Sequence, residues 1–361
     1  MGARQHLAII GDGAVAAAFL SVARLVPGDR LTLIGPNVHR FGAGRFYADH
    51  DARHPWRLAY LLDRPNGEMT EGFADWLAAE WPVLLPEIAV AQPLHVRRWS
   101  EALSEGAFGD FAAPRAIYGR YLARRSSERL AKLVEDGVQV QLITGLATDL
   151  SRADDQFRIT LASGEVIKAD RVDVATGGPA NQRFGVDAGP TAFTTLYDNE
   201  EAIARVLKPG WEVTCLGAST EVLDVMHFLR AAWPTQELRL RVLRDRATPA
   251  LDGDPEYRRL RAAGRIVEEV GRPIWVYAES AGNVRLRITG KECQSQEKTV
   301  PLAINTAGPG DQLLVDFLVS GMIAKGWLRL NAAQNRIVVG ARFATDMDGV
   351  RYASDAVAIL N

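Results

Sequence analysis

Residues 7–20, LAIIGDGAVAAAFL, lead from a short apolar segment through a glycine-rich turn into an alanine-rich segment. The four apolar residues before Gly11 predict a buried strand that ends at the turn. Apolar residues then recur at helical spacing until Pro27 and Gly28, and RLTLIG at 30–35 predicts a second buried strand. A strand, a helix and a strand in this order form a βαβ unit, which predicts a parallel sheet with a right-handed crossover.

The turn has the spacing of a pyrophosphate-binding loop. Gly11, Gly13 and Ala16 fit the pattern G-x-G-x-x-G/A. In that pattern the first glycine allows a tight turn, the second lets the backbone approach the pyrophosphate, and the third small residue lets helix and strand pack closely. The helix, which would begin beside Ala14, would direct its first amides and its dipole at the phosphate. The alternative is that these small residues only ease a strand-to-helix turn.

Two residues depart from this pattern. Asp12 places a carboxylate inside the turn, where it would repel phosphate unless it points into solvent or caps the helix. The second predicted strand ends in Gly35, where an acid normally binds a ribose hydroxyl. Asn37 or His39 could replace that acid by hydrogen bonding, with weaker anchoring of the ribose.

The composition limits the classes of function. A chain of 361 residues predicts two lobes, because a single core rarely grows this large. Its 42 basic and 44 acidic residues give a formal net charge of −2, which argues against nucleic-acid and membrane partners. No apolar run is long enough to span a bilayer, so we expect a cytoplasmic protein. We also expect a small-molecule substrate. The protein could form an oligomer, and the sequence does not give the number of subunits. Cys215 and Cys293 are far apart in sequence, which excludes a C-x-x-C redox pair.

A second strand, turn and helix are predicted by EVTCLGASTEVLDVMHFLRAA at 212–232. Gly217 begins this turn, but Ser219 and Val222 occupy the second and third glycine positions, which hampers close approach of a phosphate. The hydroxyls of Ser219 and Thr220 could still contact a phosphate.

The strand that follows ends in two arginines, Arg244 and Arg246. Arginine in place of an acid favours the 2′-phosphate of NADP over NAD, because a guanidinium pairs with phosphate through two hydrogen bonds. The alternatives are a solvated charge cluster and a degenerate nicotinamide site.

Three further segments have clear patterns. Residues 114–137 predict a long amphipathic helix, on which Arg115 favours packing but remains a candidate phosphate or substrate contact. Residues 254–271 predict a charged helix, and residues 335–360 predict a strand, a loop and a final helix. No metal site is predicted.

Four segments together resemble a known family. They are IIGDGAVAAAFL (9–20), RLAYLLDRPNGEMTEGFADWL (57–77), PRAIYGRYL (114–122) and DVATGGPA (173–180). These segments are similar to the amino-terminal half of FAD/NAD(P)-binding proteins related to flavin-dependent N-hydroxylating monooxygenases. The second βαβ pattern and the carboxy-terminal segment resemble the same group, so the resemblance covers nearly the whole chain.

With the two βαβ patterns, this resemblance implies an α/β fold of two dinucleotide-binding (Rossmann-like) domains, the second inserted into the first. The FAD-binding domain would comprise residues 1–195 and 301–361, and an NAD(P)-binding-like domain would comprise residues 196–300.

The resemblance also implies roles for individual residues. Gly11, Gly13 and Ala16 would hold the FAD pyrophosphate, and the turn at Thr176 and Gly177 would pass close to the cofactor. Residues that would approach the flavin ring are Leu62, Asp63 and Met69. Asp63 stands where relatives tend to carry an amide-bearing residue.

The function indicated is an FAD-dependent, NADPH-using oxidoreductase, a monooxygenase that hydroxylates a small amine-type nucleophile. Because the cofactor carries the chemistry, no catalytic residue is predicted. Two alternatives stay open. One is a flavoprotein dehydrogenase or oxidase with a degenerate nicotinamide site, and the other is a non-catalytic nucleotide-binding or partner protein of the same fold.

Overall fold

A computed structural model describes residues 4–49, 51, 54–177, 190–245, 251, 253–278, 282–289, 294–308, 317–332, 336–354 and 357–359. The chain divides into two compact units. Unit 1 comprises Met1–Asp49, Ala116–Pro179 and Asp311–Asn361, and unit 2 comprises His50–Arg115 and Ala180–Gly310. The domain bounds expected from the sequence stay a prediction, and this division differs from them in placing residues 50–115, 180–195 and 301–310 with unit 2.

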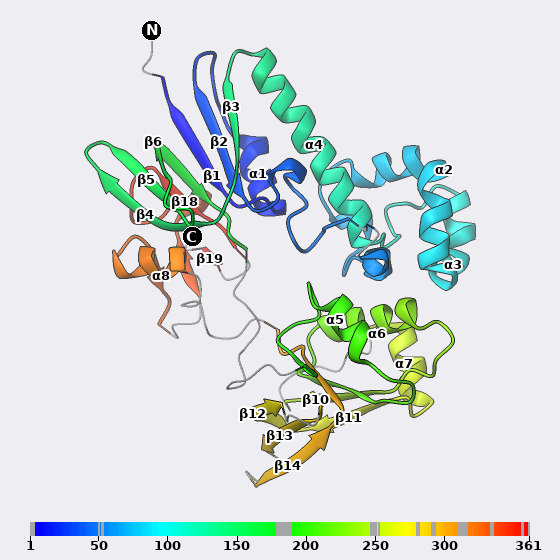
Figure 1. Cartoon of the computed structure of the whole chain (residues 1–361). Helices are drawn as coiled ribbons and strands as arrows, with labels where there is room; N and C mark the ends of the chain where they lie inside the picture. Colours follow the sequence, from blue (N-terminus) through cyan, green and yellow to red (C-terminus); the bar gives the residue numbers. More distant parts are fainter. Residues whose placement is uncertain are drawn as a thin grey trace. The chain divides into compact units, whose positions relative to one another are not determined.

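Unit 1 is built on a five-stranded parallel sheet in the order β18-β7-β1-β2-β3 (Figure 1). Its strands are β1 (His6–Ile10), β2 (Arg30–Gly35), β3 (Gln139–Thr144), β7 (Arg171–Val174) and β18 (Val350–Tyr352). Helix α1 (Ala14–Val22) connects β1 to β2, which confirms the predicted βαβ unit. The strand order reverses at β1, which has β2 on one side and β7 on the other.

Alternate residues of β1 face different layers. Leu7 and Ile9 pack in the core beneath α1 and α4 (Arg115–Glu135), while Ala8 and Ile10 pack against an antiparallel sheet and helix α8 (Phe317–Ala324). The antiparallel sheet consists of β4 (Ala147–Ala153), β5 (Gln156–Leu161) and β6 (Val166–Ala169). The remaining elements of unit 1 are the 3-10 helices η1 (Val38–Arg40) and η5 (Ala341–Phe343) and a small sheet of β16 (Arg329–Leu330), β17 (Ile337–Val339) and β19 (Val357–Ile359).

Unit 2 repeats this layering around a parallel sheet in the order β11-β10-β9-β15-β8. Cys215 faces the helices, whereas Leu216 faces a second antiparallel sheet. The parallel strands are β8 (Ala192–Phe193), β9 (Val213–Leu216), β10 (Leu240–Arg244), β11 (Ile266–Val270) and β15 (Leu302–Asn305). The antiparallel strands are β12 (Arg272–Ala278), β13 (Val284–Thr289) and β14 (Ser295–Val300).

The described helices of unit 2 comprise four that precede α4 in the chain and three that follow β8. They are η2 (Pro55–Ala59), η3 (Asn66–Glu68), α2 (Phe73–Ala91), α3 (Pro93–Ser104), α5 (Glu200–Val206), α6 (Glu221–Ala232) and α7 (Pro255–Ala262). None of the helices in the described ranges has the length and apolar composition of a membrane span. The predicted α/β fold of two Rossmann-like units, one inserted into the other, is confirmed.

Three expectations about local structure are wrong. Helix α1 ends at Val22, before the expected stop at Pro27. The charged helix expected over 254–271 ends at Ala262, because the residues after it pair with β10 as strand β11. The final helix expected in 335–360 is absent from the described part of that range, where β18 and β19 pair with β7 and β17.

Candidate dinucleotide-binding site

The glycine turn of unit 1 lies at the carboxyl end of β1, where the strand order reverses. Gly11 has a φ of 115°, and a β-carbon there would lie 2.1 Å from the carbonyl oxygen of Ala175, which follows β7. Its N–H donates to the carbonyl of Ile34 at the end of β2 (2.8 Å). Only glycine fits between these neighbours, so the turn is fixed at the place where open parallel sheets bind ligands.

Gly13 faces open space. It is the N-cap of α1 with an extended backbone, and a β-carbon there would meet no atom within 4 Å. No side chain caps α1, and its first turn holds no acidic residue. Since the first amides of a helix have no partner within it, the N–H groups that begin α1 at the half-buried Ala14 are available to an anion. Ala16 is fully buried, which lets α1 pack against the sheet.

A second glycine-rich segment, FGAGRFY at 41–47, packs on this turn. The N–H groups of Gly42 and Gly44 both donate to the carbonyl oxygen of Asp12 (2.8 and 3.1 Å). A β-carbon on Gly44 would lie 2.8 Å from the Cα of Gly13, so no side chain fits there. This segment was not predicted as part of the site, and its closely spaced glycines are the signal that could have identified it.

Asp12 takes a direction that the sequence did not suggest. The residue is 7% exposed and its side chain does not cap α1, so the carboxylate neither points into solvent nor caps the helix. Oδ2 accepts a hydrogen bond from the backbone N–H of Asn37, just beyond β2. Burial raises the pKa of this carboxyl and the Asn37 N–H lowers it. Asn37 thus contributes its backbone here, while the ring of His39 lies 3.4 Å from the hydroxyl of Thr144.

Thr176 and Gly177 follow β7, next to the glycine turn. The hydroxyl of Thr176 is buried and has no hydrogen-bond partner among the described residues. Gly177 has a φ of 92°, and a β-carbon there would meet no atom within 4 Å. An unpaired buried hydroxyl costs about 1–3 kcal/mol, so it favours a polar ligand that satisfies it. The residues around this turn therefore fit a dinucleotide cofactor.

The turn after β9 in unit 2 has a similar backbone but is closed by its own contacts. Gly217 has a φ of 111°, and a β-carbon there would lie 2.2 Å from the Cα of Ala307. The hydroxyl of Thr306 donates to the carbonyl of Gly217 (2.7 Å), and Ser219 Oγ accepts from the N–H of Glu221 (3.2 Å). In contrast to Thr176 in unit 1, the threonine beside this turn already has a partner.

The first turn of α6 also contains buried carboxylates. Thr220 is the N-cap and makes no side-chain capping bond. Glu221 accepts from the hydroxyl of Thr195 and from the N–H of Leu196, both at 2.7 Å. A carboxylate at a helix N-terminus satisfies the dipole and repels a second anion. This turn therefore fits a pyrophosphate less well than the turn after β1.

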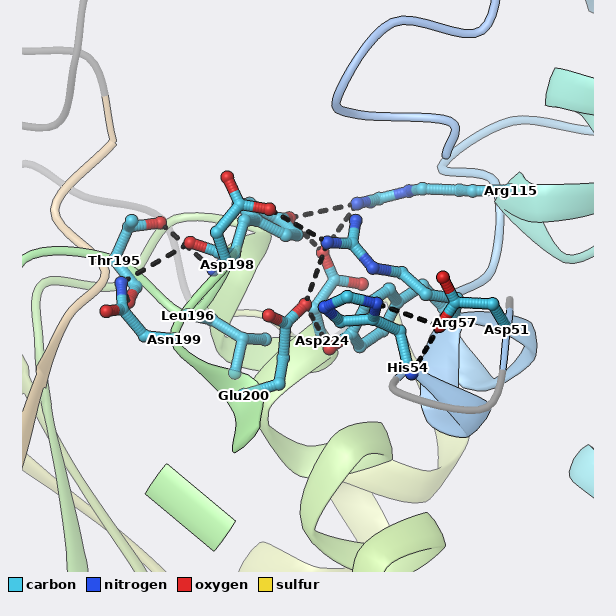
Figure 2. A network of polar contacts seen from close by, with 12 residues as sticks. Asp51, His54, Arg57, Arg115, Thr195, Leu196, Asp198, Asn199, Glu200 and Asp224 are labelled. Atoms are coloured by element: carbon cyan, nitrogen blue, oxygen red, sulfur yellow. Dashed lines mark hydrogen bonds and ion pairs between the residues drawn. The ribbon is translucent and has the colours of Figure 1, made fainter. Parts of the chain in front are cut away.

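Arg115 is buried and belongs to a network of polar contacts in unit 2 (Figure 2). Its guanidinium contacts Asp224 Oδ2 at 2.5 Å, Asp63 Oδ1 at 2.7 Å and the hydroxyl of Tyr197 at 3.0 Å. Burial raises the pKa of Asp224 to about 6, against the opposing effect of Arg115. Two carboxylates offset the charge of Arg115, which favours the interpretation that it stabilises the fold.

The residues expected near a flavin ring lie in unit 2. Leu62 is buried, and its N–H donates to the carbonyl of Ala113 (2.9 Å). Asp63 pairs with Arg115, and Met69 is half-buried beyond η3. Their approach to a flavin bound at the turn of unit 1 stays a prediction.

Arg244, at the end of β10, already has an acidic neighbour. Its Nε lies 3.2 Å from Glu268 Oε2 on β11. Glu268 also accepts from the hydroxyl of Tyr257 (3.0 Å). Arg246, the other arginine expected to select a 2′-phosphate, lies outside the described residues. A 2′-phosphate at Arg244 would therefore compete with Glu268.

Residues 8–179 match the model of a family described as FAD-NAD(P)-binding. The match covers a little under half of the chain, and it shows that this segment is similar to FAD-NAD(P)-binding domains. The match contains the turn at Gly11 and Gly13, the segment 41–47 and the turn at Thr176. It confirms the predicted cofactor class, FAD with NAD(P). None of the curated proteins matches the sequence significantly.

Solved structures share the fold over nearly the whole chain. The ornithine N-hydroxylase of Kutzneria sp. 744 has a TM-score of 0.57 and 13% identity, covering 99% of this chain and 92% of its own. The cadaverine monooxygenase DfoA of Erwinia amylovora, bound to FAD, has a TM-score of 0.58 and 12% identity, covering 97% and 88%. Thioredoxin reductase of Lactococcus lactis has a TM-score of 0.57 and 12% identity, covering 98% and 91%. The predicted family resemblance is confirmed at the level of fold, and these identities carry no reaction with them.

Proposed function

We propose that the protein is an FAD-dependent, NADPH-using monooxygenase that hydroxylates a small amine-type nucleophile. The family match and the fold support its coarser description as an FAD/NAD(P)-binding oxidoreductase. The observation that carries the proposal is the open N-terminus of α1, where Gly13 faces free space, no side chain caps the helix and its first turn holds no acid. We expect the FAD pyrophosphate at this place.

When bound, FAD supplies the hydride and oxygen chemistry. The residues of the chain bind and orient it. Gly11 fixes the turn between β2 and the residue after β7, and Gly13 leaves room in front of the amides of α1. The buried hydroxyl of Thr176, which has no hydrogen-bond partner among the described residues, would donate to a polar atom of the cofactor.

The cysteines favour the monooxygenases over the disulfide reductases among the similar structures. Dithiol exchange needs a reactive thiolate next to a second thiol. The chain has only Cys215 and Cys293, separated by many residues, and Cys293 lies outside the described residues. Cys215 is fully buried, and burial raises the pKa of its thiol, so it stays protonated.

A second candidate is a flavoprotein oxidase or dehydrogenase whose second nucleotide site is degenerate. The first turn of α6 favours it, because the carboxylate of Glu221 lies at this helix N-terminus and would repel the pyrophosphate of a nicotinamide dinucleotide. The two candidates differ in whether NADPH reduces the flavin.

The test begins with purified protein mixed with FAD. Flavin absorbance that stays with the protein after gel filtration, anaerobic bleaching by NADPH, and a hydroxylated product from ornithine, lysine or cadaverine would support the monooxygenase. Bound FAD that NADPH does not bleach would select the second candidate. Protein that does not bind FAD would overturn both. The Cys215→Ala variant is the control, and we expect its NADPH oxidation to match wild type.

A further inference from the structure

We propose that Asp12, inside the glycine turn, supplies the carboxylate that binds the adenosine ribose of FAD. It would replace the acid that is missing from the end of β2. This inference rests on the proposed binding of FAD at the turn of unit 1 and adds the residue that would recognise the ribose.

The space around Gly35 is the first argument. In dinucleotide-binding folds the ribose-binding acid stands at the end of the second strand, which is here the position of Gly35. A β-carbon on Gly35 would lie 2.9 Å from both Cβ and Oδ2 of Asp12. The carboxylate of Asp12 therefore occupies the space where a side chain at position 35 would begin. The chain has room for an acid at one of these positions but not at both.

The second argument is that the backbone holds Asp12 in this direction. The N–H of Asn37 donates to Oδ2, and the N–H groups of Gly42 and Gly44 donate to the carbonyl oxygen. Asp12 is 7% exposed, so its side chain is held among protein atoms before any ligand arrives. A fixed carboxylate binds a hydroxyl group with little further loss of side-chain entropy.

The chemistry follows from the charge. A ribose hydroxyl donates a hydrogen bond to a carboxylate, and bonds of this kind are stronger than those between neutral groups. The same carboxylate would repel a 2′-phosphate. Asp12 would thus make the turn of unit 1 specific for FAD or another adenine dinucleotide with a free 2′-hydroxyl.

The first experiment measures ribose recognition without enzyme turnover. ADP and 2′-deoxy-ADP are used as competitors that displace FAD, with the displacement followed by flavin fluorescence. We expect wild type to bind ADP about 10- to 100-fold more tightly than 2′-deoxy-ADP, and Asp12→Ala to lose this preference together with a similar part of its affinity for FAD. Asp149→Asn, which removes a carboxylate paired with Lys325 elsewhere in unit 1, is the matched control and should behave as wild type.

The second experiment moves the acid back to β2. Gly35→Glu alone should bind FAD poorly, because its β-carbon would collide with Asp12. Asp12→Gly should also bind poorly. The double variant Asp12→Gly, Gly35→Glu removes the collision and restores an acid, so it should regain at least about tenfold in affinity over either single variant.

The outcomes separate the two proposals. If wild type binds no FAD, the proposed function fails and this inference fails with it. If wild type binds FAD but Asp12→Ala keeps both its affinity and its preference for ADP, only the inference is overturned. If Asp12→Ala does not fold, Asp12→Asn decides, because it keeps an acceptor for the Asn37 N–H and loses the charge. An unchanged preference for ADP in Asp12→Asn would overturn the inference.

Discussion

Replacement of Gly13 by aspartate should separate the stability of the fold from its affinity for FAD. Gly13 is the N-cap of α1 with φ −89° and ψ −173°, and a β-carbon there would meet no atom within 4 Å. Aspartate is among the best N-cap residues, and a carboxylate at a helix N-terminus stabilises the helix by about 0.3–1 kcal/mol. We therefore expect the free energy of unfolding of the Gly13→Asp apoprotein to equal or exceed that of wild type.

The same carboxylate should oppose the pyrophosphate. Two like unit charges about 4 Å apart, in an effective dielectric of about 20, repel by about 4 kcal/mol. That energy corresponds to about a thousandfold weaker binding, and salt screening at this half-buried position reduces it. We expect the dissociation constant for FAD to rise by about a hundredfold.

The assay is a flavin fluorescence titration, paired with urea unfolding of each apoprotein. Gly13→Ala is the neutral control and should bind FAD more tightly than Gly13→Asp. Gly11→Ala is a second control, because here the stability of the fold should fall together with the affinity for FAD. Its β-carbon would lie 2.1 Å from a carbonyl oxygen at a φ of 115°, so it should lose stability as well as binding. Tight FAD binding by Gly13→Asp would refute the placement of the pyrophosphate at α1.

Three further predictions concern other parts of the molecule. Gly44→Ala should lower the free energy of unfolding by about 1–3 kcal/mol in a thermal melt, because its β-carbon would lie 2.8 Å from the Cα of Gly13; a wild-type melt would contradict the packing of segment 41–47 on the turn. The pKa of Asp224 is about 6 in the folded protein, above its ordinary 3.8, so its contribution to stability is complete below about pH 4 and is lost as the pH rises through 6. Urea unfolding at several pH values should show that Asp224→Asn removes a fall of about 3 kcal/mol over this window, and an unaltered pH dependence would count against the shifted pKa. Glu268→Gln removes the carboxylate 3.2 Å from Arg244 and should raise the preference for NADPH over NADH up to about tenfold, whereas an unchanged ratio of dissociation constants would argue against a 2′-phosphate contact.

Local patterns were sufficient to predict β1, the glycine turn, α1 and β2. The apolar run before Gly11 and the helical spacing after it depend only on neighbouring residues, and the structure confirms both elements. The direction of the Asp12 side chain could not be predicted from local patterns, because it depends on the backbone N–H of Asn37. The pairing of β2 with β1 brings this group next to the turn. The segment 41–47 was missed for the same reason, since its glycines are explained by contacts with Asp12 and Gly13.

The helix wrongly expected over residues 254–271 also prevented the prediction of the contact between Glu268 and Arg244. Residues 254–271 have a helical pattern over much of their length, so Glu268 was expected on a helix. In the structure it lies on β11, beside Val242 of β10. That register places its carboxylate next to Arg244. The pairing of strands decided both the secondary structure and the partner of the arginine, and no local pattern contains that information.

The position of β18 in unit 1 has a consequence for synthesis. Its residues, Val350–Tyr352, pair with Arg171–Val174 of β7, and Arg351 pairs with Asp173, whose side chain is 1% exposed. A ribosome completes all of unit 2 before it makes β18. Until then the nascent chain presents the edge of β7 with a carboxylate that lacks its cation. Such an edge can pair with other chains, so we expect the newly made protein to need protection by a chaperone during the last stage of translation.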